Sequence, residues 1–174
     1  YNMPLGFRMR TRMRGRIDPA GLDRALCEVA RRHETLRTRY RTRDGRPEAV
    51  LERPPVRLLS VADLAALPAD LRETEAHRLV EGEAGRPFDL ERGPVLRALL
   101  VRLGEGDAAA LFVAHHIACD GWSMGLWARE LSALWRGAAL PEPPVQYSDF
   151  ARWQRGWLQG DVLEEQVAYW RDRL

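Results

Sequence analysis

Two long apolar runs, residues 95–103 and 109–114, restrict the fold of this chain more than any other feature of its sequence. Only Arg97 and Arg102 interrupt the first run, and a Gly-Glu-Gly-Asp sequence at 104–107 connects the two. Continuous apolar runs are typical of strands that are buried on both faces, and a short glycine-containing connection favours an antiparallel pair. We therefore expect two adjacent, centrally buried strands within a sheet.

Before this pair, the sequence alternates between strand and helix patterns. Residues 5–14 alternate between mainly apolar residues and mainly arginines, which predicts a half-buried strand with a cationic outer face. An Asp-Pro start and apolar residues at helical spacing predict a helix over 18–33. A second alternating segment at 36–41 and the Asp-Gly pair at 44–45 predict a hairpin that returns through 48–52. The N-terminal third is therefore expected to be β-α-β-β.

Further helices are expected after this region. Another apolar stretch occupies 56–61, and a polar helix is predicted over 69–84. Its apolar stripe is thin and consists of Leu71, Leu79 and Val80. Residues 124–135 have the pattern of an amphipathic helix that packs on the sheet, and two tryptophan-containing helices at 150–157 and 163–174 are expected to be core. Together these patterns predict an α+β fold in which helices pack on a mixed or antiparallel sheet.

The composition of the 174 residues, 45% of them hydrophobic, is sufficient for a sizeable core and excludes a disordered tail. All 27 basic residues are arginine, which we attribute first to a GC-rich genome. Residues 1–46 carry a net charge of +8 and residues 47–174 carry −6. Such asymmetry is compatible with a basic binding module for an acidic carrier protein or nucleic acid, without catalysis. The sparse aromatics and the absence of an RNP-like or zinc-finger pattern argue against nucleic acid.

The cellular setting expected from the sequence is cytoplasmic. No apolar run approaches the roughly 20 residues that a membrane-spanning helix requires. The chain opens without a secretory signal pattern, and we expect Cys27 and Cys119 to be free thiols.

The segment from His115 to Gly121 concentrates polar and reactive side chains where a buried strand ends and a helix is about to begin. Successive strand residues point to opposite faces, so His115 and His116 are not expected to serve one centre. Imidazole transfers protons near neutral pH, and Asp120 is close enough in sequence to fix or polarise the loop. Gly121 permits backbone geometry or close ligand approach that a side chain would block.

Two plainer interpretations accompany this one. A histidine pair at a strand end is commonly structural, and a metal site that combines His116, Cys119 and Asp120 with the distant His33 or His77 lacks the usual ligand spacing. We therefore expect no metal. Taken alone, the arginines at 31, 32 and 37 are typical of a solvated helix face.

Four segments, in order, resemble motifs of the condensation domains of nonribosomal peptide synthetases. Residues 115–123 resemble the HHxxxDG motif, and 32–38 resemble RHExLRT. Residues 87–97 resemble PFDLxxGPxLR, and 147–153 resemble YxDFAxW. The resemblance implies a chloramphenicol acetyltransferase-like fold, in which two lobes enclose a tunnel. It also implies that residues 1–174 form the N-terminal lobe, without the family's first motif and its C-terminal lobe, and that the lobe alone is inactive.

The resemblance assigns roles to individual residues. His116, the second histidine of the motif, is implied to be catalytic, and His115 to support the loop from the core side. Asp120 is implied to hold the loop by an ion pair to an arginine, for which Arg37 is a candidate.

The resemblance also implies the reaction and its partners. The α-amine of one carrier-bound aminoacyl thioester attacks a peptidyl thioester on another, giving an amide. Gly121, Trp122 and Ser123 line the path of the phosphopantetheine arm. The partners are the donor and acceptor peptidyl carrier proteins, with no directly bound cofactor and no membrane.

Overall fold

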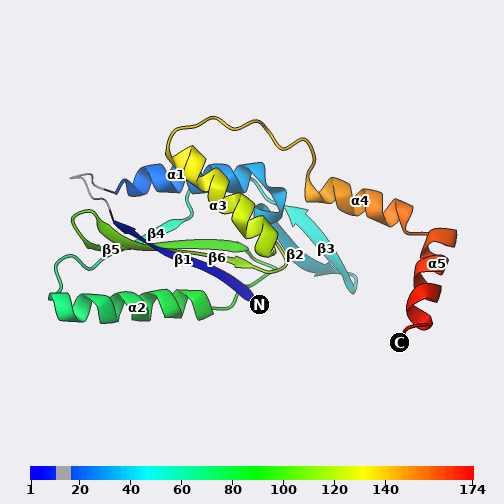
Figure 1. The fold of residues 1–174 in the computed structure, drawn as a ribbon, viewed down its shortest axis with the longest axis horizontal. Coiled ribbons are helices and arrows are strands. Elements are labelled where there is room, and N and C mark those ends of the chain that lie inside the picture. Colours follow the sequence, from blue (N-terminus) through cyan, green and yellow to red (C-terminus); the bar gives the residue numbers. More distant parts are fainter. Residues whose placement is uncertain (11–16) are drawn as a thin grey trace. The chain divides into compact units, whose positions relative to one another are not determined.

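The computed structural model describes residues 1–10 and 17–174, with the side chains of 1–6 and 17–174, and divides into two units. The first unit is residues 1–141 and the second is 142–174. Figure 1 shows the elements of both. The predicted strand over 5–14 is present up to Arg10, and its remainder lies outside the described residues.

A four-stranded mixed sheet forms the centre of the first unit, in the order β1-β6-β5-β4. The predicted central pair is confirmed: β5 (Leu96–Gly104) and β6 (Asp107–His115) are adjacent and antiparallel. β1 (Asn2–Arg10) pairs antiparallel with β6, and β4 (Leu59–Asp63) pairs parallel with β5. Because β5 and β6 have a strand on each side and helices on both faces, their apolar runs are largely buried.

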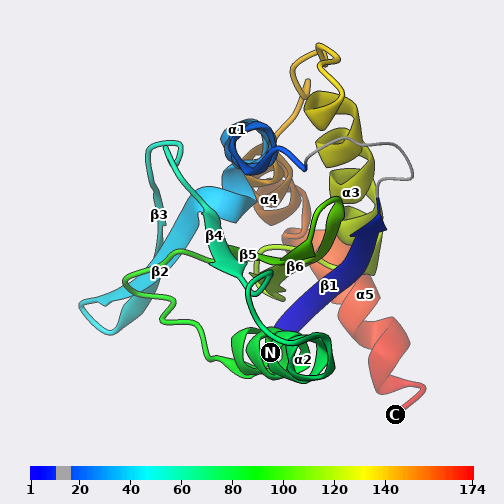
Figure 2. The same ribbon diagram turned by 90° about the vertical axis from the view of Figure 1, so that its left-hand side faces the viewer.

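Helices α1 (Pro19–Arg32) and α3 (Gly121–Trp135) cover one face of this sheet, as Figures 1 and 2 show. Their apolar stripes and the even-numbered residues of β5 and β6 form the larger core cluster. The rings of Phe112 on β6 and Trp127 on α3 meet edge to face, 5.6 Å apart. The helix predicted over 124–135 therefore packs on the sheet as expected.

Helix α2 (Ala69–Gly85) covers the opposite face and forms a smaller core with Val101 and Leu103. The predicted stripe is wrong at one position. Leu71 is 55% exposed, and the buried stripe begins at Ala76. Leu71 lies in the first turn of the helix, five residues before Ala76, and this spacing places the two side chains on different faces.

The predicted hairpin forms a separate two-stranded sheet of β2 (Thr38–Arg43) and β3 (Arg46–Leu51). Asp44 and Gly45 have φ angles of 50° and 73°, as a two-residue turn of this twist requires. The strand starts later than predicted because the 3₁₀ helix η1 (Glu34–Arg37) follows α1.

The second unit contains α4 (Tyr147–Trp157) and α5 (Gly160–Arg171). α4 begins with reciprocal hydrogen bonds between Gln146 and Asp149, and its aromatic side chains stack along one side. No side chain of these two helices is buried, so the prediction that their tryptophans are core is wrong. Over the described residues, none of the helices has the length and apolarity needed to span a membrane.

Candidate active site

The histidine pair lies where β6 leaves the sheet. The odd-numbered residues of β6 face α2, and His115, the last residue of the strand, belongs to this set. His116 begins the turn that follows. Its backbone N–H donates to the carbonyl of Tyr1 over 2.9 Å, and its ring meets that of Tyr1 at 4.6 Å between centroids. The structure thus gives the two imidazoles different surroundings.

His115 is held on several sides. Its Nδ1 accepts a hydrogen bond from the backbone N–H of Ile117 over 3.1 Å, and its carbonyl accepts from Ala118 over 2.9 Å. Its ring meets Phe88 edge to face at 6.0 Å. Partial burial is the main cause that lowers the pKa of His115, and the neighbouring His116 acts in the same direction. The neutral form that accepts from Ile117 is therefore favoured.

His116 differs from His115 in its hydrogen bonding. Among the described side chains, those of residues 1–6 and 17–174, no hydrogen bond or ion pair engages its imidazole, and the side chain is half-buried. An imidazole with unengaged nitrogens beside a turn is able to exchange a proton with a ligand.

Asp120 caps α3. One carboxylate oxygen accepts from the backbone N–H of Ser123 over 2.8 Å and from its hydroxyl over 2.6 Å. These two bonds, first that from the hydroxyl, lower the pKa of Asp120. The aspartate therefore fixes the start of the helix that follows the histidine turn.

The expected ion pair between Asp120 and Arg37 is not formed in the described part of the chain. η1 directs Arg37 toward β3, where its guanidinium donates to the carbonyl of Glu52 over 2.6 Å. The same guanidinium lies 3.8 Å from the carboxylate of Glu34.

The first turn of α3 presents the three residues expected along the phosphopantetheine path. Trp122 is 84% exposed, which is unusual for an indole, and Ser123 is engaged by Asp120. The space where a Gly121 side chain would lie is open. The backbone conformation at this position is therefore not one that requires glycine.

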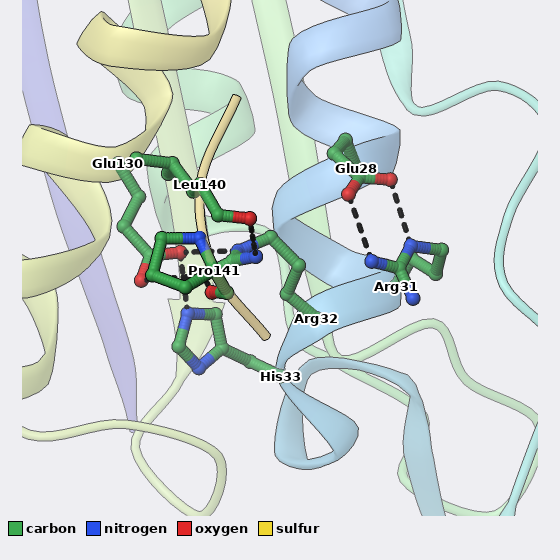
Figure 3. Close-up of polar contacts among 7 residues, drawn as sticks. All are labelled: Glu28, Arg31, Arg32, His33, Glu130, Leu140 and Pro141. Carbon is green, nitrogen blue, oxygen red and sulfur yellow. Dashed lines mark hydrogen bonds and ion pairs between the residues drawn. The ribbon is translucent and has the colours of Figure 1, made fainter. Parts of the chain in front are cut away.

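A buried cluster of ion pairs lies between α1 and α3 (Figure 3), and the sequence did not indicate it. Arg32 is 4% exposed, and its guanidinium donates to Glu130 over 3.0 Å and to the carbonyls of Leu140 and Pro141. His33 also contacts Glu130, over 2.8 Å. The prediction of a solvated face is therefore wrong for Arg32, whereas Arg31 forms a half-exposed pair with Glu28.

The two distant histidines that were considered as metal ligands each contact a glutamate. Glu130 engages His33, and His77 on α2 lies 3.3 Å from Glu81. The described residues contain no group of three or more His, Cys, Asp and Glu side chains that could hold a metal ion.

Both cysteines are free, and burial raises the pKa of each thiol to about 11, assisted by Asp23 for Cys27 and by Asp120 for Cys119.

Comparisons with known proteins agree with the motifs. The family model of the condensation domain matches residues 1–174. A linear gramicidin synthase from Brevibacillus parabrevis is 44% identical over 180 residues, which cover 100% of this chain and 3% of that protein. SgcC5 from Streptomyces globisporus is 32% identical with a TM-score of 0.81, over 100% of this chain and 40% of that one. The X-domain from teicoplanin biosynthesis is 27% identical with a TM-score of 0.82, over 98% and 38%.

These matches confirm the predicted fold class, α+β with a mixed sheet packed by helices. The chain spans two fifths of the SgcC5 chain and a few hundredths of the gramicidin synthase. The motifs, the architecture and the family match agree, and the chain therefore belongs to the condensation-domain family of nonribosomal peptide synthetases.

Proposed function

We propose that residues 1–174 form the N-terminal lobe of a condensation domain that joins two carrier-bound thioesters through an amide bond. The observation that carries this proposal is the contrast between the two histidines. His115 accepts a hydrogen bond from Ile117 and its ring meets Phe88, whereas the His116 imidazole meets the Tyr1 ring and has no hydrogen bond or ion pair among the described side chains. Asp120 fixes the helix start beside them. This arrangement supports a turn that is held rigid and presents one imidazole to a substrate.

The reaction requires no redox partner. The amine nitrogen attacks the thioester carbonyl, the C–N bond forms, the C–S bond breaks, and the carrier thiol leaves with the proton that the amine loses. A free α-amine has a pKa of about 8 and is partly neutral at pH 7, so base strength is only part of the requirement. In this proposal His116 accepts the amine proton, passes it to the leaving thiolate, and holds the amine in line with the carbonyl.

The substrates arrive on phosphopantetheine arms of donor and acceptor carrier proteins, and Gly121, Trp122 and Ser123 line the path. The open space at Gly121 and the exposed indole of Trp122 support this role, because a flexible arm needs a clear approach and an apolar surface. The two free thiols, both with raised pKa values, fit the reducing cytoplasm that we propose as the site of action.

The test is single-turnover condensation by an intact two-lobed domain that carries this chain, with both carriers loaded. We expect His116→Ala to slow the reaction by roughly 10²–10⁴-fold, the range of a positioned general base. His77→Ala is the matched control, because this exposed histidine lies on α2, across the sheet from the larger core. An unchanged rate in a folded His116→Ala variant would remove His116 from the catalytic role. Residues 1–174 alone should not turn over.

A further inference from the structure

We propose that Arg97 is a positioning residue for the catalytic turn and that it acts through Phe88 and His115 on His116. The inference rests on the proposed function for its link to rate, and on observed contacts for its geometry. Arg97 lies on β5 opposite Val113 of β6, two residues before His115. Residues of one strand alternate between faces, so Arg97 and His115 lie on the same side of the sheet, the side that α2 covers.

The guanidinium of Arg97 holds the C-terminal end of α2. Its Nε donates to the carboxylate of Glu83 over 2.5 Å, and its two terminal nitrogens donate to backbone carbonyls. The carbonyls belong to Glu83 at 3.2 Å, Arg86 at 2.6 Å and Pro87 at 3.2 Å. A cation that bonds the last carbonyls of a helix is favoured by the helix dipole. The side chain of Arg97 is only 11% exposed, so these bonds hold it in one orientation.

In this orientation Arg97 stacks on Phe88. The guanidinium carbon lies 3.7 Å from the centroid of the Phe88 ring. A cation over a ring face is attracted to the ring's quadrupole, and this attraction strengthens away from water. The Phe88 ring also contacts His115, which it meets at 84° and 6.0 Å. Phe88 thus transmits the position of Arg97 to the imidazole.

His115 in turn sets the path of the catalytic turn. Its Nδ1 accepts from the N–H of Ile117, so the ring and the backbone on both sides of His116 form one closed unit. A shift of the His115 ring would therefore displace His116. The chain of contacts runs from Arg97 through Phe88 and His115 to Ile117 without a gap.

Asn2 provides a second support that does not pass through the ring. It lies opposite His115 on β1, and its side-chain amide donates to the carbonyls of Ala84 over 2.7 Å and Arg86 over 2.9 Å. The N-terminal end of β1 accordingly lies beside the C-terminal end of α2 (Figure 1). The docking of α2 therefore has a support besides Arg97, whereas Arg97 alone among the described residues makes a cation–π contact with Phe88.

The test uses the intact condensation domain and two variants. Arg97→Gln removes the charge and the stacking plane. Phe88→Leu retains apolar volume and the hydrogen bonds of Arg97, and removes only the ring between guanidinium and imidazole. Two quantities are measured: the hydrogen-exchange rate of the Ile117 amide by NMR, and kcat and KM with loaded carriers.

We expect both variants to exchange the Ile117 amide faster and to lower kcat about 10- to 100-fold, because small displacements of a reacting group have effects of this size. KM for the carriers should not change. Arg97→Lys keeps the charge but not the planar fork, and should resemble Arg97→Gln. Arg102→Gln is the matched control on the same strand. Its half-exposed pair with Asp63 lies apart from this chain of contacts, so Ile117 exchange and kcat should equal those of the wild type.

Wild-type Ile117 exchange in folded Arg97→Gln and Phe88→Leu variants would overturn the proposal. If Arg97→Gln does not fold, wild-type exchange in Phe88→Leu is sufficient to overturn it. A lower kcat without faster Ile117 exchange also contradicts it. The exchange measurement needs no turnover, so it distinguishes this inference from the proposed function, which His116→Ala tests separately.

Discussion

At the residue scale, the environment of each arginine decides its role. Every basic residue of the chain is arginine, so the residue type alone separates none of them. Arg31 and Arg32 are neighbours, yet one forms a half-exposed pair with Glu28 and the other is buried against Glu130 (Figure 3). A buried guanidinium requires a partner for its charge and its donors, and α3 and the segment after it supply both.

The pair offers a direct comparison of stability. Arg32→Met should lower the free energy of unfolding by about 3–5 kcal/mol, because it leaves the Glu130 carboxylate buried beside a neutral side chain. Arg31→Met should lower it by less than about 1 kcal/mol, the range of surface pairs. Urea unfolding of both variants is the measurement. Equal losses would show that burial does not govern the Arg32 pair.

The pH dependence of stability should report on Glu130. Burial alone raises its pKa, but hydrogen bonds from Arg32 and His33 and their charges outweigh this effect and lower it. A carboxyl group with a lower pKa in the folded state contributes stability above its unfolded pKa, and the contribution is lost as the pH falls through the folded value. The stability difference between wild type and Glu130→Gln should therefore be complete near neutral pH and shrink below about pH 4. A difference that stays constant down to about pH 2 would contradict this.

At the element scale, the strongest local patterns identified the right structures. The apolar runs at 95–103 and 109–114 became β5 and β6, and the Asp-Gly pair became the turn of the hairpin. Two features with weak patterns were misplaced or missed. The thin stripe of α2 was misassigned at Leu71, and η1 was not predicted because a single 3₁₀ turn has too few residues to show a period.

The same substitution at two glycines should have opposite effects. Gly45→Ala should lower the free energy of unfolding by about 1 kcal/mol, because an alanine is strained at the φ of 73° in this turn. Gly82→Ala, at an exposed position inside α2 with open space around it, should raise it by up to about 1 kcal/mol. Thermal unfolding of the two variants measures both signs. A stabilising Gly45→Ala would show that the turn conformation is different.

At the scale of the whole molecule, folding brings arginines of residues 1–46 next to acids of residues 47–174. The arginines of β2 lie opposite the acids of β3 and just beyond it: Arg39 pairs with Glu52, and Arg41 and Arg43 pair with Glu48. Some of the positive charge of residues 1–46 is thus compensated locally by acids of residues 47–174. The comparisons give no support to the alternative of a noncatalytic basic binding module. The side chains of the arginines at 8–16 lie outside the described residues.

The sequence by itself determined the central strands, the hairpin, the helix that follows the histidine turn, and the family motifs, since each depends on residues close together along the chain. Only the tertiary structure decided which side chains meet. Glu130 is 98 residues from Arg32, and Arg97 reaches His115 through Phe88 from another strand. Such contacts depend on the register of the sheet and the packing of α1 and α3, and local periodicity carries no information about either. Asp120 is a different case, because its bonds to Ser123, three residues further on, form a local helix cap, whereas the candidate pairing with Arg37 required a long-range contact.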